Sequence, residues 1–174
     1  MTGFDPDALL EVLHRHEVRY VLIGGLAAAL RGSATPTFDV DITPAAGAAN
    51  LARLSAALKE LDARIRVDGV PEGFPFSHDA ASLSQMTTLN LVTRFGDLDI
   101  AFDPAGVPDY FQWEADATMV TVLGVPVQVA SLDDIIRSKE AADRDKDRLQ
   151  LPMLRALQQR QHRMEKPPDD LESP

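Results

Sequence analysis

Ile23-Gly24-Gly25 and Asp39-Val40-Asp41-Ile42, thirteen residues apart, are the two stretches of this sequence that decide the fold. The first follows the apolar run Tyr20–Ile23 and precedes Leu26–Arg31, an order that is typical of a strand turning into a helix. Backbone amides at such a turn can face a phosphate, because glycines permit close approach and the helix N-terminus adds a favourable partial charge. Gly24 and Gly25 are therefore candidate phosphate-binding residues.

The second stretch predicts a pair of carboxylates on one face of a strand. Strand alternation puts Asp39 and Asp41 together, about 7 Å apart along the strand, while Val40 and Ile42 point into the core. Two like charges on one face repel each other, and aspartate disfavours strands, so a compensating cation is expected. Hard divalent cations such as Mg²⁺ take oxygen ligands and bridge protein carboxylates to phosphates. We therefore expect a metal and nucleotide site here.

A further carboxylate is expected on a neighbouring strand. Alternation along Gly96–Phe102 buries the apolar side chains and leaves Asp97 and Asp99 together on the opposite face. Asp97 lies nearer a hairpin turn, where aspartate is common. The pattern alone leaves either residue as the third carboxylate.

Length and composition indicate one domain over residues 1–163, followed by an acidic, Pro-rich and disordered tail over residues 164–174. The chain has no cysteine, no signal-peptide pattern and no apolar run long enough to span a bilayer, so a cytoplasmic protein is expected. Its net charge of −10 argues against nucleic acid as a partner. Residues 131–163, however, hold eight Lys or Arg against six acids, so this segment is locally basic.

Periodicity and turn signals predict an α/β (α+β) fold, with a mixed sheet, flanking helices and a C-terminal helical segment over residues 131–163. Asn50 is expected to cap the second long helix, residues 69–79 to form a loop and residues 109–116 an acidic linker. The expected helices are 5–16, 25–31, 51–62 and two between 132 and 161; the expected strands are 18–23, one from Asp39, 63–67, 89–93, 98–102, 119–123 and 125–129.

These motifs resemble a known enzyme superfamily. Gly24-Gly25 followed by Asp39–Ile42 is similar to the signature of the DNA polymerase beta-like nucleotidyltransferases. More closely, Tyr20–Ala28 and Asp39–Pro44 resemble the small AbiEii/MenT-type nucleotidyltransferases, which are toxins of toxin–antitoxin pairs. The likeness continues through Ser131–Ala142 and Lys146-Asp147, and so covers the chain up to about residue 157.

The resemblance implies the polymerase beta-like fold and roles for particular residues. It favours Asp99 over Asp97, and it implies that Asp39, Asp41 and Asp99 are the catalytic carboxylates and hold Mg²⁺ or Mn²⁺. Nucleotide binding would fall to the residues Gly24, Gly25, Thr37 and Lys139.

Two of these assignments have a plain alternative. Thr37 could simply end the loop, and Lys139 could be a solvent-facing helix lysine. The family often has a basic residue near position 35, where this chain has Thr35-Pro36, so this loop departs from the family pattern for substrate contacts.

Three functions are compatible with the sequence. The first, which the resemblance favours, is a toxin that transfers a nucleoside monophosphate from an NTP to an RNA 3′ end, most plausibly of tRNA, and is neutralised by a separate antitoxin. The second is a small-molecule (antibiotic) nucleotidyltransferase with the same metal chemistry. The third is a non-catalytic nucleotide-binding module, against which the complete set of carboxylates argues. An extended basic approach would favour RNA, and a closed acidic or aromatic pocket would favour a small molecule.

Overall fold

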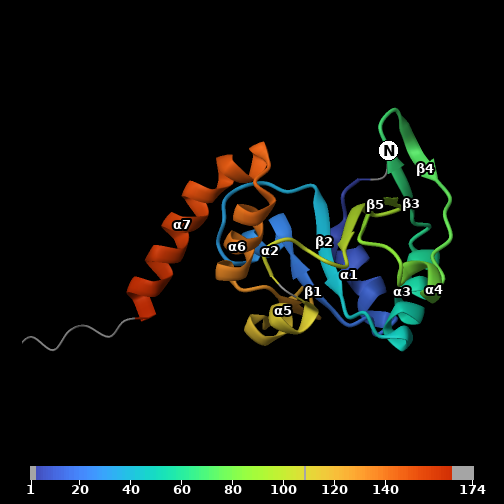
Figure 1. Ribbon diagram of the computed structural model, residues 1–174, viewed down its shortest axis with the longest axis horizontal. Coiled ribbons are helices and arrows are strands. Elements are labelled where there is room, and N and C mark those ends of the chain that lie inside the picture. The colour runs from blue at the N-terminus through green and yellow to red at the C-terminus, as the bar shows by residue number, and fades with distance from the viewer. Residues whose placement is uncertain (1–2, 108, 166–174) are drawn as a thin grey trace, which may run out of the picture.

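One mixed sheet of eight strands organises the protein. The computed structural model describes residues 3–107 and 109–165. Within them the strands lie in the order β4-β3-β5-β6-β2-β1-β8-β7, with helices on both faces (Figure 1). The strands are β1 (Tyr20–Ile23), β2 (Asp39–Pro44), β3 (Arg64–Val67), β4 (Val70–Phe74), β5 (Thr88–Thr93), β6 (Gly96–Ala101), β7 (Thr118–Val122) and β8 (Val125–Val129).

The helices cover the two faces of the sheet. α1 and α3 contact each other, while α2 packs on β1 and β2 and also contacts α6. α7 packs against α6, and its far end projects from the rest of the protein (Figure 1). The helices are α1 (Pro6–Arg15), α2 (Gly24–Leu30), α3 (Ala48–Glu60), α4 (Ala80–Leu83), α5 (Tyr110–Asp116), α6 (Leu132–Ala142) and α7 (Asp145–Glu165).

Local sequence explains where these elements begin and end. The Asp5 side chain accepts a hydrogen bond from the Ala8 amide and Pro6 occupies the first helical position, so α1 begins at Pro6, inside the expected range 5–16. Ser131 caps α6 by accepting a hydrogen bond from the Asp134 amide. Asp143 adopts a left-handed conformation (φ 48°), and this single residue ends α6 and redirects the chain into α7.

Two parallel pairings set the centre of the sheet. β2 pairs in parallel with β6 and β1 in parallel with β8, whereas the other neighbouring pairs are antiparallel. Val40, Ile42, Leu98 and Ile100 are almost completely buried on one face, as alternation predicts. The aspartates of β2 and β6 consequently share the opposite face. The mixed sheet, flanking helices and C-terminal helical segment confirm the predicted fold class.

Four local expectations were wrong. Residues 69–79 do not form a loop throughout, because they include β4, and residues 109–116 are not a linker but contain α5. Asn50 does not cap α3, which starts earlier at Ala48; it is buried and bonds the backbone of Arg19 and Ala45. The expected tail begins inside α7, since residues 164 and 165 are helical; residues 166–174 lie outside the described part.

Within residues 3–107 and 109–165, none of the helices has both the length and the apolar character that a membrane span requires.

Candidate active site

Three carboxylates converge where β2 and β6 run side by side. The parallel register sets Asp41 opposite Asp99 and Asp39 opposite Asp97. One carboxylate oxygen from each of Asp39, Asp41 and Asp99 lies within 4.8 Å of the others. The structure therefore brings together the three residues that the family resemblance favoured, although their catalytic role stays a prediction.

The electrostatics of this cluster fit a divalent cation. Burial, followed by repulsion from Asp39 and Asp99, raises the pKa of Asp41 to about 7. Burial also raises the pKa of Asp99, although hydrogen bonds from Arg66 oppose the shift. Three oxygen donors whose negative charges are mutually unfavourable form a donor set that suits Mg²⁺ or Mn²⁺.

The Gly24-Gly25 turn is shaped around the Asp41 carboxylate. Gly24 has a φ of +67°, which favours glycine, and a Cβ there would overlap the Asp41 side chain. The Gly25 backbone amide also acts on this carboxylate and lowers the pKa of Asp41 in part. A Cβ on Gly25 would lie 2.5 Å from Thr37 Oγ1. Gly24 is thus required for packing against Asp41 and Gly25 for packing against Thr37, and their contact with a triphosphate stays a prediction.

Thr37 orients the first carboxylate. Its Oγ1 donates to Asp39 Oδ1 at 2.8 Å. This contact supplies a structural reason for a hydroxyl two residues before Asp39, besides the predicted contact with substrate. The threonine does more than end the loop.

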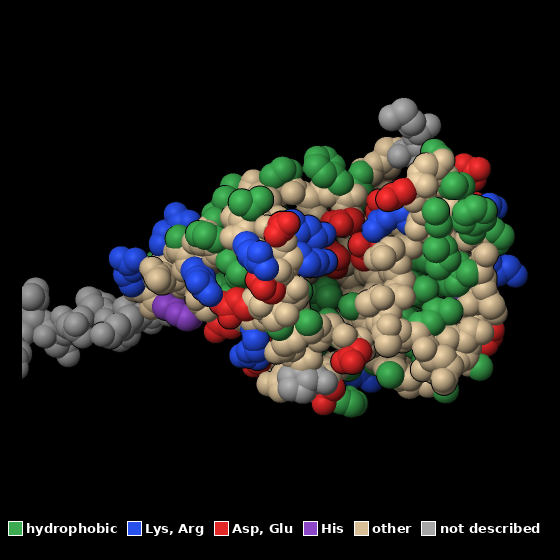
Figure 2. Space-filling model, turned by 45° about the horizontal axis from the view of Figure 1, so that its top comes forward, with side chains coloured by type: hydrophobic (Ala, Val, Ile, Leu, Met, Phe, Trp, Pro, Cys, Tyr) green, Lys and Arg blue, Asp and Glu red, His purple; other side chains and the backbone are tan. Residues whose placement is uncertain are grey.

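A cavity of about 230 Å³ opens beside the carboxylates. Its walls come from the Gly24-Gly25 turn, the loop of residues 33–38 and the start of α7. Lys139, Arg144 and Lys146 line it together with Asp39 and Asp41, so positive and negative side chains face the same space. Figure 2 shows acidic and basic side chains gathered around a hollow on this face of the molecule. Such a cavity can hold a metal-bound phosphate chain.

Lys139 is not a solvent-facing lysine. Only 8% of the residue is exposed, and Nζ lies 3.1 Å from Asp147 Oδ1. Arg144 Nε donates to the other oxygen of Asp147 at 2.6 Å. Burial raises the pKa of Asp147, but these hydrogen bonds outweigh it and hold the pKa below its usual value. Asp147 therefore fixes both cations at the edge of the cavity.

Sequence reasoning missed Arg66, which binds the third carboxylate. Its guanidinium donates to both oxygens of Asp99, at 2.8 and 3.0 Å, and lies 2.8 Å from Asp97 Oδ2. Strand β5 lies between β3, which carries Arg66, and β6, which carries Asp99. Ile65 of β3 pairs with Leu91 of β5, and the adjacent Asn90 of β5 pairs with Asp99 of β6, so the pairing brings Arg66 close to Asp99. Arg66 could have been found only with the strand order known, because about thirty residues separate it from Asp97 and Asp99. Asp97 is thereby engaged as a partner of Arg66.

Comparisons with known proteins identify the class of fold. No protein-family model matches the sequence, and no curated protein matches it significantly. Among solved structures, the chain has the mixed α/β fold of nucleotidyltransferases. It is similar to the lincosamide antibiotic adenylyltransferase LnuA, solved with lincomycin bound, with a TM-score of 0.58 and 16% identity over 90% of this chain and 99% of that one. It also matches the antibiotic-resistance factor ANT(2'')-Ia, with a TM-score of 0.49 and 17% identity over 90% of each chain. At such identities the similarity defines the fold, and the activity has to be argued from the site.

Proposed function

We propose that this protein is a metal-dependent nucleotidyltransferase that moves a nucleoside monophosphate from an NTP to an acceptor hydroxyl. The observation that carries the proposal is the convergence of Asp39, Asp41 and Asp99 within 4.8 Å, beside a cavity lined by three cations. When bound by these carboxylates, Mg²⁺ or Mn²⁺ would supply charge neutralisation at the α-phosphate and acidify the attacking hydroxyl.

The chain's own residues would act on the two ends of the reaction. The acceptor oxygen forms a bond to the α-phosphorus while the bond to pyrophosphate breaks, and Asp99 takes the hydroxyl proton. Lys139, Arg144 and Lys146 attract the departing pyrophosphate, because they line the cavity next to Asp41. Arg66 donates to both Asp99 oxygens and so orients the carboxylate that takes the proton.

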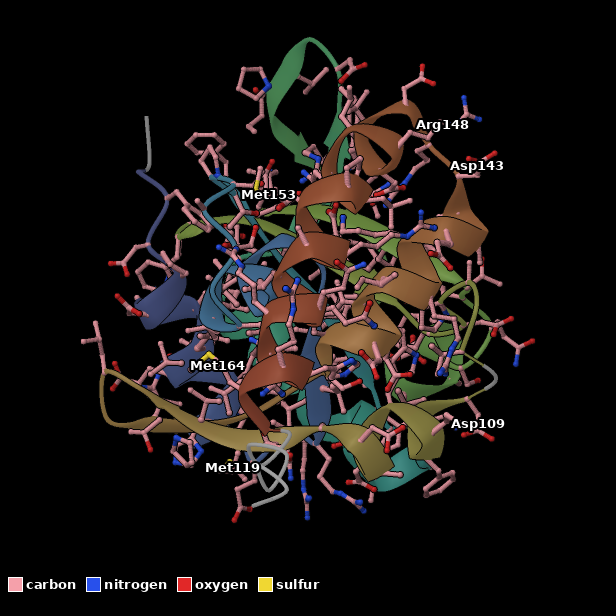
Figure 3. All side chains as sticks on the ribbon, turned by 90° about the vertical axis from the view of Figure 1, so that its left-hand side faces the viewer. Asp109, Met119, Asp143, Arg148, Met153 and Met164 are labelled. Atoms are coloured by element: carbon pink, nitrogen blue, oxygen red, sulfur yellow. The ribbon has the colours of Figure 1, made fainter. Side chains whose placement is uncertain are left out.

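We propose an RNA 3′ end, most plausibly that of tRNA, as the acceptor. The resemblance to AbiEii/MenT-type enzymes supports this, and so do two exposed arginines, Arg144 just before α7 and Arg148 in its first turn. Arg144 and Arg148 each expose 58% of their side chains. Figure 3 shows Arg148 near Asp143, with which it forms an ion pair of 2.7 Å, so part of this charge is already compensated. In this proposal the protein is a cytoplasmic toxin held in check by a separate antitoxin protein.

A small hydroxylated molecule is the second candidate acceptor. A cavity of about 330 Å³ lies on the other side of Asp41 and shares Gly24, Lys139 and Arg144 with the first cavity. Asp103 and Trp113 contribute to its walls, which gives it acidic and aromatic character. The similarity of fold to LnuA adds to this alternative. The non-catalytic alternative is weaker, because all three carboxylates are present.

The deciding experiment incubates the protein with Mg²⁺, each α-labelled NTP in turn, and either total RNA or a panel of hydroxylated antibiotics that includes lincomycin. Label in the RNA 3′ end supports the RNA acceptor, and label in an antibiotic supports the alternative. Asp41→Asn and excess chelator serve as controls, and both should abolish either transfer. Transfer that continues in chelator would overturn the metal-dependent mechanism.

A further inference from the structure

Phe38 is an aromatic side chain exposed beside the carboxylates. It leaves 75% of its surface open to solvent and directly precedes Asp39. Phe38 also lines the cavity that contains Gly25, Lys139 and Lys146. Keeping a phenyl ring in water forgoes the free energy that its burial would contribute, so its position does not serve the stability of the fold. An exposed ring at the mouth of a polar cavity instead offers a flat surface to a ligand.

The wall opposite the loop of residues 33–38 comes from one face of α7. Lys146, Gln150 and Met153 are spaced four and three residues apart, so they lie on the same side of the helix. Met153 turns toward the loop, since its sulfur lies 3.8 Å from Thr35 Oγ1 (Figure 3). Lys146 and Gln150 line the same cavity as Phe38. The loop and the helix therefore form two walls of one site.

This cavity is lined by two chemically different sets of groups. The carboxylates and the cations Lys139, Arg144 and Lys146 suit metal-bound phosphates. The Phe38 ring and the Gln150 amide, which carries both donors and an acceptor, suit a flat heterocycle. A nucleoside triphosphate carries the matching groups, a charged phosphate chain and a flat base with polar edges.

From this juxtaposition we propose that the Phe38 ring is the platform on which the base of the bound NTP stacks. The proposal rests on the proposed nucleotidyltransferase function and adds a residue that holds the nucleoside. Stacking tolerates different bases, because every base has a π face. One platform accommodates one base, which fits a single bound nucleotide rather than a track of single-stranded RNA.

Nucleotide binding by a Phe38 variant and by a matched control tests the platform directly. Phe38→Leu keeps an apolar side chain and removes the flat ring. The probes are the four NTPs and inorganic triphosphate, each titrated with Mg²⁺ into the full chain. Phe38→Leu should weaken NTP binding by about 5- to 150-fold, the range expected for loss of one stacked base, and should leave inorganic triphosphate within about twofold of wild type. Phe111→Leu is the matched control, because Phe111 is 71% exposed but lines a different cavity.

Phe38→Trp provides an optical readout. The natural Trp113 is fully buried, so a tryptophan at position 38 would be the exposed one among the described residues. NTPs should quench its fluorescence, whereas inorganic triphosphate should not.

The outcomes separate this proposal from the proposed function. If wild type binds neither NTPs nor triphosphate, the nucleotidyltransferase function itself fails. If wild type binds both and Phe38→Leu binds NTPs equally well, only the stacking platform fails. A Phe38→Leu protein that loses transfer to RNA with unchanged NTP affinity would also overturn the proposal, because the stacked base would then belong to the acceptor.

Discussion

Asp41 is the residue at which the needs of folding and of chemistry oppose each other. Its carboxylate is held among Asp39, Asp99 and the Gly24-Gly25 turn, and its pKa is raised to about 7. In the unfolded chain the carboxyl of Asp41 has an ordinary pKa of about 4. Between these values the folded protein holds a proton that the unfolded protein lacks. The free energy of unfolding therefore falls as pH rises from about 4 to about 7, and this contribution stays lost above about pH 7.

Asp41→Asn should consequently stabilise the metal-free protein at about pH 8 while abolishing transfer. The amide carries no charge to bury or to repel, so we expect a gain on the order of 1–3 kcal/mol at about pH 8 and little difference near about pH 4. Thermal melting in chelator at both pH values measures this. An equal melting temperature for the two proteins at the higher pH would contradict the raised pKa, and wild-type turnover by the variant would contradict the metal site.

Lys139 has a structural and a predicted chemical role, which two substitutions can separate. Lys139→Ala removes one of two cations from the fully buried Asp147 carboxylate, so it should destabilise the fold by about 1–3 kcal/mol. If the lysine also contacts the triphosphate, this variant should weaken NTP binding by at least about tenfold. Asp147→Asn is the control, because it loosens the same ion pair and keeps the ammonium. Denaturant unfolding and NTP titration of Lys139→Ala and Asp147→Asn distinguish the two roles. If both variants lose the same amount of NTP affinity, Lys139 has a structural role alone.

At the scale of elements, the turn from β1 into α2 depends on glycine for two reasons. Gly24→Ala would strain a backbone with φ +67° and drive a Cβ into the Asp41 carboxylate, so we expect lost transfer and a destabilisation of about 1–3 kcal/mol. Gly69→Ala is the matched control, because Gly69 also has a positive φ (+80°) but a Cβ there would meet no atom within 4 Å. Comparing Gly24→Ala with Gly69→Ala in melting and transfer assays separates the effect of backbone strain from the effect of the Cβ overlap with Asp41. Equal behaviour would show that the Asp41 contact is unimportant.

The elements that sequence reasoning found share strong local signals. β2 and β6 alternate regularly, and α1 and α6 begin at capping residues, so their existence followed from periodicity and caps. β4 reads Val-Pro-Glu-Gly-Phe, and its proline and glycine concealed a strand that exists because β3 pairs with it. The acidic residues of α5 led to the prediction of a linker, although the segment is a helix whose Trp113 is buried in the core. Both were missed because tertiary contacts override weak local preference.

At the scale of the whole molecule, metal binding should increase the thermal stability of the protein. A cation bound by Asp39, Asp41 and Asp99 in the folded state alone stabilises it by mass action. Mg²⁺ or Mn²⁺ should therefore raise the melting temperature of wild type at about pH 8 and support transfer, while Zn²⁺ should not replace them in the transfer assay. The same titration on Asp41→Asn should show a much smaller rise. An equal rise in both proteins would place the cation elsewhere.

The predictable part of the site is the part that local patterns and the family resemblance cover. Asp39 and Asp41 share one strand, so their common face could be inferred from alternation, whereas the choice of Asp99 over Asp97 came from the resemblance. The contacts of Arg66 and of Asp147 could not, because they depend on strand order and on how α7 packs on α6. A single domain over residues 1–163 likewise stays a prediction, with the helical boundary moved to residue 165.

The parallel pairing of β1 with β8 has a consequence for the synthesis of the chain. Leu22 pairs with Val129, so the ribosome synthesises β8 more than a hundred residues after the β1 strand with which it pairs. At about 5–20 residues per second, this interval lasts roughly 5–20 s on the ribosome. The apolar edge of β1 stays unpaired on that side for all of this time, and the cations of α6 and α7 arrive later still. The carboxylates are thus translated before the cations that complete their cavity. A chain ending at Gly124 lacks β8, which pairs with β1, so protease should digest it readily under conditions in which the full chain resists.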